Sequence, residues 1–158
     1  MKIELASGTR PQEGYLHCDV RLLESTDLLC RVETLPFATN SVEALLASHI
    51  IEHFSYRETD TVLKEWHRVL RPGGTILIIT PNLAYIAYGY VEGWMDYTEA
   101  RNRLFGGQDY PFNYHYTSFD SPDMSKTLEE VGFQNVRDIT SQFESRKVPM
   151  SLYFSAEK

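Results

Sequence analysis

The chain has 158 residues, 42% of them hydrophobic, which is enough to bury one core but hardly two. Its 22 acidic residues against 15 Lys and Arg give a formal net charge of −7, which disfavours binding to the phosphate backbone of nucleic acids. No apolar run approaches membrane-spanning length and no signal peptide is recognisable, so we expect no membrane partner and a cytoplasmic location.

The metal-ligating residue types show no ligand-like spacing. The two cysteines, Cys18 and Cys30, lie in apolar, strand-like segments without a CxxC arrangement, so two buried thiols are expected. The histidines and carboxylates form no recognisable cluster along the chain. The sequence therefore predicts no metal site.

Short apolar segments predict strands, and those rich in continuous apolar residues are typical of a parallel sheet covered on both faces. The predicted strands of the first half are 2–6, 15–20, 27–32, 42–48 and 75–80.

Between the fourth and fifth of these strands lies the clearest helix. Ser55 and Glu58 have the spacing of a capping box, and an apolar stripe at intervals of three and four runs through residues 62–70. Pro72 and the two glycines after it end the helix. This strand, helix and strand form a βαβ unit.

A second helix is expected late in the chain. Ser121 is its predicted N-cap, Pro122 its first residue and Gly132 its C-terminal stop. Segments 135–140 and 151–156 follow without a helix between them, so we expect them to pair antiparallel at the edge of the sheet.

The first crossover is unusually short. Only seven residues, from Gly8 to Gly14, separate the first two strands, whereas parallel strands normally need a dozen or more, usually including a helix. Seven extended residues span at most about 24 Å and a strand of five runs about 17 Å, so the chain can return only as a stretched strap. One sheet face then lacks a covering helix, and we expect its exposed apolar surface to favour a homodimer.

Three motifs in the middle of the chain carry a family resemblance. They are LPF at 35–37 with NSVE at 40–43, HIIEH at 49–53 and RVLRPGG at 68–74. In this order and spacing they resemble the class I S-adenosylmethionine-dependent methyltransferases, close to small predicted members with a shortened glycine loop.

The resemblance covers nearly the whole chain and implies its fold. The expected class is α/β, with a Rossmann-like sheet that is mostly parallel with one antiparallel edge strand and has its first crossover helix missing or reduced. We expect a single domain over residues 1–158. The resemblance also implies S-adenosylmethionine as cofactor, lying across the carboxyl ends of the first strands.

The resemblance assigns cofactor-binding roles residue by residue. Ser7 and Gly8 are expected to line the methionine part, together with Ser48 and His49 after the fourth strand. Asp19 is expected to accept hydrogen bonds from the ribose hydroxyls. The ASGTRP loop has a single glycine where the dinucleotide fingerprint has three, which disfavours a nicotinamide or flavin dinucleotide.

One position departs from the family. Where relatives usually carry an Asp that accepts a bond from the adenine amino group, this chain has Arg31, which can only donate. Three alternatives are open: Arg31 stacks on the adenine, Glu33 replaces the missing carboxylate, or the adenine pocket has decayed. Arg31 and the adjacent Val32 are therefore candidate cofactor contacts.

Residues 83–119 form an aromatic-rich insertion after the fifth strand, which in this family commonly makes the substrate lid. Aromatic side chains with polar tips suit sugars, although a minor core or dimer contact is an equal alternative. His115 within it is the first candidate for a catalytic base, with His49 second. Glu52 and His53 are expected to hold the following loop in place.

The predicted function is S-adenosylmethionine-dependent methyl transfer to a small-molecule or glycan-type acceptor. The alternative is a methyltransferase-like, non-catalytic binding or assembly module with a weakened cofactor site. Arg31 and the short crossovers favour the module, whereas Gly8, Asp19 and the HIIEH segment favour the enzyme.

Overall fold

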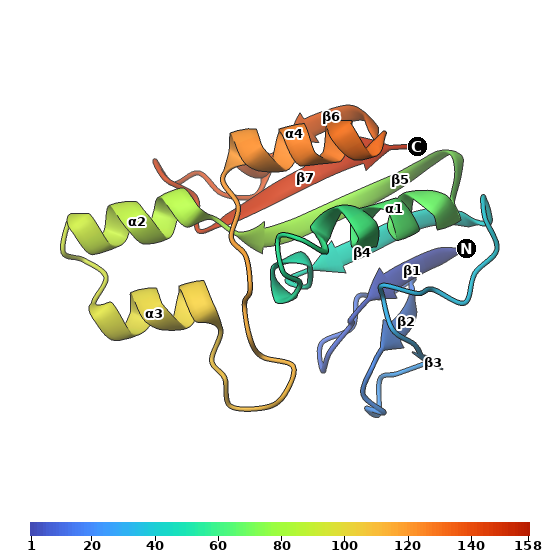
Figure 1. Ribbon diagram of the computed structural model, residues 1–158, viewed down its shortest axis with the longest axis horizontal. Helices are drawn as coiled ribbons and strands as arrows, with labels where there is room; N and C mark the ends of the chain where they lie inside the picture. The colour runs from blue at the N-terminus through green and yellow to red at the C-terminus, as the bar shows by residue number, and fades with distance from the viewer.

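A computed structural model describes all residues from 1 to 158 and shows one seven-stranded sheet with its helices (Figure 1). The strand order is β3-β2-β1-β4-β5-β7-β6. The strands are β1 (Lys2–Leu5), β2 (Leu16–Asp19), β3 (Leu28–Leu29), β4 (Val42–Ser48), β5 (Leu70–Pro81), β6 (Gln134–Asp138) and β7 (Ser151–Glu157).

The expected α/β class and mostly parallel sheet are confirmed. Strands β1 to β5 pair in parallel, and β7 pairs antiparallel with both β5 and β6. The single reversed strand is thus β7, one place in from the edge, and β6 is the edge strand. The chain reaches β6 through a helix, which leaves beside β5 a gap that β7 fills in the opposite direction.

Two helices, α1 (Thr59–Val69) and α4 (Ser121–Val131), lie side by side on one face of the sheet (Figure 1). That face is made of side chains in register across the strands, such as Ile3, Leu45 and Ile76, all at most 1% exposed. Trp66 of α1 and Met124 of α4 pack into the same core. The βαβ unit expected around α1 is confirmed.

The helix starts differ in detail from the expectation. Glu58 accepts a bond from the Ser55 amide at 3.1 Å, but this half of the capping box closes a turn just before α1. Ser121 is not the cap of α4; Asp120 is, since its carboxylate accepts from the Asp123 amide. Asp120 precedes Ser121 and supplies a charged acceptor at the positive end of the helix.

No helix lies between β1 and β2, between β2 and β3, or between β3 and β4, which confirms the missing crossover helix. The residues after Gly8 form the expected strap, in which the Gln12 amide donates to Glu4 at 2.6 Å. On the face opposite α1 and α4, Leu77, Ile79 and Tyr153 are only partly buried. One sheet face is therefore left without a helical layer.

Helices α2 (Leu83–Val91) and α3 (Tyr97–Phe105) lie beside the carboxyl end of β5 (Figure 1). They form a small second core of Tyr85, Ile86, Met95 and Ala100. Two short 3₁₀ helices, η1 (Ile51–His53) and η2 (Thr140–Gln142), complete the fold. None of the helices is both long enough and apolar enough to cross a bilayer.

Arg68 explains why the LPF and RVLRPGG motifs occur together. Its guanidinium donates to the Leu35 and Phe37 carbonyls at 3.2 and 3.0 Å, and Glu65 accepts both from Arg68 and from the Leu35 amide. The end of α1 thus holds the loop that follows β3, and with it the residues just upstream at the sheet's carboxyl end.

Candidate functional site

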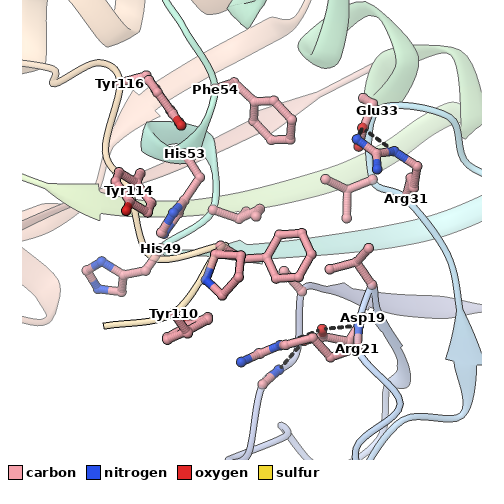
Figure 2. A pocket seen from close by; sticks show the side chains of 17 residues that line it. Asp19, Arg21, Arg31, Glu33, His49, His53, Phe54, Tyr110, Tyr114 and Tyr116 are labelled. Atoms are coloured by element: carbon pink, nitrogen blue, oxygen red, sulfur yellow. Dashed lines mark hydrogen bonds and ion pairs between the residues drawn. The ribbon is translucent and has the colours of Figure 1, made fainter. Parts of the chain in front are cut away.

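The carboxyl ends of β1, β2 and β4 open onto a cavity of about 430 Å³, closed on its far side by the segment 110–116 (Figure 2). This volume is typical of a small-molecule site. The lining residues are Ala6, Gly8, Asp19, Val20, Arg21, Arg31, Val32, Glu33, His49, Ile50, His53, Phe54, Tyr110, Pro111, Phe112, Tyr114 and Tyr116.

Left-handed backbone conformations mark the strand ends at this cavity. Ala6 after β1 and His49 after β4 have φ values of 52° and 53°, and Gly8 has 61°. Such conformations are costly for residues other than glycine and cluster at functional sites. The sharp turns expose the backbone around Gly8 and direct His49 to the cavity.

Asp19 ends β2 at the floor of the cavity and is already fully engaged (Figure 2). Its carboxylate accepts from the Gly8 amide at 3.0 Å, and from the Arg21 amide, Nε and Nη2 at 2.8, 3.0 and 3.1 Å. Burial alone raises the pKa of Asp19, but the bonds from Arg21 and Gly8 outweigh it and lower the pKa below its ordinary value. Asp19 is therefore ionised and joins β1 to β2.

Arg21 is the residue that sequence reasoning missed. Besides pairing with Asp19, its guanidinium lies 5.2 Å from the ring centre of Tyr110, which joins the end of β2 to the aromatic insertion. In the sequence, only its position two residues after Asp19 could have marked Arg21 as a site residue. That signal is weak, because an arginine or lysine close to an Asp is common in any sequence.

Residues 31–33, which are expected to contact the adenine, are held by bonds within the protein. Arg31 and Glu33 pair with each other, with Arg31 Nε 2.6 Å from Glu33 Oε1, so neither is without a partner (Figure 2). Between them, the Val32 carbonyl accepts from Trp66 Nε1 at 2.9 Å. The fully buried Trp66 thereby fixes this wall of the cavity to α1.

Most of the predicted cofactor residues meet at this cavity: Gly8, Asp19, Arg31, Val32 and His49 line it. Ser7 and Ser48 do not line it. Ser7 is 8% exposed and its Oγ is buried without a hydrogen-bonding partner, and Ser48 ends β4. The predicted base His115 lies elsewhere.

A second cavity of about 410 Å³ adjoins the first, and six of its ten lining residues carry polar side chains. His115 lines this second cavity, and His49 lines both. Its lining residues are His49, Pro81, Asn102, Arg103, Gly106, Gly107, Asn113, His115, Met150 and Ser151.

The two candidate bases have different hydrogen-bonding partners. His49 Nδ1 lies 3.3 Å from Oε1 of Glu52, which is 1% exposed, and Glu52 Oε2 accepts from Thr80 at 3.1 Å. His115 Nδ1 lies 2.9 Å from the Arg103 carbonyl. A carboxylate partner that orients an imidazole is typical of a general base, so the geometry favours His49 over His115.

The loop that carries His115 is held in place rather than hinged. The Glu52 carbonyl accepts from the Tyr116 and Thr117 amides, so η1 anchors this distant loop rather than the loop that directly follows His53. Gly106, which ends α3, has φ of 77°, and a Cβ there would lie 2.4 Å from the Asn113 carbonyl oxygen. Its role is to let the loop return closely upon itself.

Comparisons with known proteins bear on the family and on the fold. Residues 6–78 match the methyltransferase domain family. No curated protein matches the chain in sequence. The resemblance to class I S-adenosylmethionine-dependent methyltransferases is confirmed.

Solved structures of low sequence identity share the fold. The 1,6-didemethyltoxoflavin-N1-methyltransferase of Burkholderia thailandensis, solved with 1,6-didemethyltoxoflavin and S-adenosylhomocysteine, gives a TM-score of 0.67 at 16% identity, over 99% of this chain and 70% of that one. An S-adenosylmethionine-dependent methyltransferase from Thermotoga maritima gives a TM-score of 0.66 at 14% identity, over 99% of this chain and 81% of that one. Another such methyltransferase, from Archaeoglobus fulgidus, gives a TM-score of 0.62 at 12% identity, over 99% of this chain and 85% of that one.

Proposed function

We propose that this chain is a class I S-adenosylmethionine-dependent methyltransferase that methylates a small polar acceptor of the sugar type; the match of residues 6–78 to the methyltransferase domain family and the shared fold support the proposal. The observation that carries this proposal is the position of His49, which lines both the cavity at the strand ends and the adjoining polar cavity. The first cavity takes the cofactor and the second takes the acceptor, so His49 lies where the two ligands meet.

The residues of the first cavity fit the cofactor. Gly8 gives close access to backbone, the buried Ser7 Oγ beside it lacks a partner, and Asp19 supplies a carboxylate at the position expected for ribose. Val32 and the Arg31–Glu33 pair form the wall on the adenine side. When bound, S-adenosylmethionine supplies an electrophilic methyl group on its sulfonium.

His49 is the proposed base. With Nδ1 directed to Glu52, its Nε2 is left to accept the proton of an acceptor hydroxyl. Buried Glu52 and Thr80 hold the ring in that orientation. His115 and the polar side chains of the second cavity position the acceptor, and the aromatic residues between 83 and 119 serve as its lid.

Substitution of the two histidines tests these roles in a radiolabelled methyl-transfer assay against a panel of sugars and sugar phosphates. We expect His49→Gln to lower kcat by about 10²- to 10⁴-fold, the usual contribution of general base catalysis. His115→Ala should raise KM more than it lowers kcat. A larger loss of kcat in His115→Ala would transfer the role of base to His115.

Cofactor binding is tested without knowledge of the acceptor, by calorimetry with S-adenosylhomocysteine. Asp19→Asn removes a carboxylate that accepts charge-assisted bonds, so we expect at least a tenfold loss of affinity. Asp27→Asn is the matched control, because Asp27 accepts from the His17 amide at the amino end of β3, has a mostly exposed side chain and lies outside the cavity. Equal affinity in both variants would contradict the placement.

One observation favours the second candidate, a non-catalytic binding or assembly module. Arg21 and Gly8 already occupy both oxygens of Asp19, which is 1% exposed, so a ribose must compete with Arg21. Absence of S-adenosylhomocysteine binding even at millimolar concentration would support the module, and micromolar binding would support the enzyme.

We further propose that two copies associate through the sheet face that carries no helix. Leu77, Ile79 and Tyr153 form a neutral, partly exposed row on this face, and a twofold axis brings such a row against itself without bringing like charges together. A cytoplasmic location agrees with the two free, buried thiols of Cys18 and Cys30.

A further inference from the structure

The wall between the two cavities contains a group of three potential metal ligands. One ligand atom each from Glu52, His53 and His115 lie within 4.8 Å of one another. His53 lines the cofactor cavity and His115 lines the acceptor cavity, so the cluster separates the two. Its members come from η1 and from the aromatic insertion, more than sixty residues further along the chain.

The Glu52 carboxylate of the cluster accepts few hydrogen bonds and so keeps free lone pairs. The buried Glu52 carboxylate has two partners, His49 on one oxygen and Thr80 on the other, and each carboxylate oxygen has a second lone pair. A buried carboxylate with so few donors calls for a positive charge nearby.

One imidazole of the cluster has the tautomer that a metal ligand needs, and the other has a nitrogen without a partner. His115 Nδ1 lies 2.9 Å from the Arg103 carbonyl, which sets the tautomer with the proton on Nδ1 and leaves Nε2 bare. His53 Nδ1 is buried and has no hydrogen-bonding partner. A buried polar atom without a partner is the usual mark of a missing ion or water.

We propose that Glu52, His53 and His115 form a binding site for a divalent transition metal of the Zn²⁺ type, on the wall between the cofactor and acceptor cavities. Two imidazole nitrogens and one carboxylate oxygen suit Zn²⁺, whereas Mg²⁺ and Ca²⁺ prefer oxygen ligands alone. Three protein ligands leave a coordination position open. Ligands about 2.1 Å from Zn²⁺ lie roughly 3.4 Å apart, so the rings must close by about an ångström.

Calorimetric titration of the whole chain with Zn²⁺, without cofactor or acceptor, tests this site. We expect one Zn²⁺ per chain, and at least a tenfold weaker affinity in His115→Ala and in Glu52→Gln. His67→Ala is the matched control, because His67 lies on α1 against Phe133 and outside the cluster. Co²⁺ serves as a second probe, and its visible absorption bands should appear in the wild type and vanish in His115→Ala.

The results of these titrations decide whether the metal site exists, independently of the proposed methyl transfer. Failure of the wild type to bind Zn²⁺ stoichiometrically at about 100 µM would overturn the proposal, as would unchanged affinity in both variants. Circular dichroism shows whether each variant is folded, and Glu52→Gln provides the comparison if His115→Ala is not. S-adenosylhomocysteine binding is measured separately, so loss of metal binding with intact cofactor binding leaves the proposed methyl transfer standing.

Discussion

Single hydrogen bonds connect the core of this protein to the cavity at the strand ends. Trp66 is fully buried in α1, and its indole N–H donates to the carbonyl of Val32, a cavity residue. Asp19 similarly joins the loop after β1 to the end of β2. At this scale the site is shaped by groups that do not themselves face the ligand.

Trp66→Phe tests the first of these links. The change leaves the buried Val32 carbonyl without its donor, which costs about 1–3 kcal/mol of unfolding free energy. Trp94→Phe is the control, since Trp94 is 48% exposed and far from this bond. Urea unfolding followed by circular dichroism measures both, and equal stability of the two variants would show that the bond contributes little.

His67 makes stability depend on pH. Burial, with the nearby charge of Lys158, lowers the pKa of His67 below 6.5, so the folded chain favours the neutral ring. Below that value the unfolded chain binds more protons, and stability falls as the pH drops. Unfolding free energy should therefore fall less between about pH 7.5 and about pH 5.5 in His67→Gln than in the wild type. Parallel pH profiles would contradict this assignment.

At the scale of elements, the connections between strands β1 to β4 are loops held by hydrogen bonds, not helices. The strap after β1, the Arg68-bound loop after β3 and the segment from Gly106 to Tyr116 are all held by side chains or glycines. The last of these presents His115 and the aromatic wall, and Gly106 at the end of α3 lets it return close to Asn113.

A pair of glycine substitutions tests how much the close approach at Gly106 matters for stability. Gly93→Ala should cost about 1–2 kcal/mol, the usual penalty of a left-handed backbone, because nothing lies within 4 Å of its added Cβ. Gly106→Ala meets the Asn113 carbonyl at 2.4 Å in addition and should cost clearly more. Thermal unfolding compares the two, and an equally small effect at both positions would mean that the loop yields freely.

For the whole molecule, the main feature is a sheet covered by helices on one face only (Figure 1). In the proposed dimer, Leu77→Lys puts a charge into the apolar row and should lower the dimer fraction at least tenfold in sedimentation velocity. Thr61→Lys, at an exposed position of α1 on the opposite face of the sheet, should leave association unchanged. A wild-type chain that is monomeric at high concentration would exclude this interface.

The sequence by itself determined the sheet, because apolar runs, capping residues and turn glycines act locally or along one strand. Strand β4 matches its predicted bounds of 42–48, and the seven-residue span from Gly8 to Gly14 was enough to exclude a crossover helix. The meeting of Gly8, Asp19 and His49 at one cavity also followed from the strand ends, since the carboxyl ends of parallel strands lie at one edge of the sheet.

Only the tertiary structure decided which side chains meet across long distances in the chain. The bond from Trp66 to the Val32 carbonyl, the bond from Arg68 to the Leu35 carbonyl and the meeting of His53 with His115 depend on rotamers and on where loops return to the sheet. Spacing along the chain carries no information on such contacts, because a loop can close at many lengths for nearly the same entropy. For the same reason the expectation of no metal site could not anticipate the Glu52 cluster, whose third member is supplied by packing rather than by local sequence.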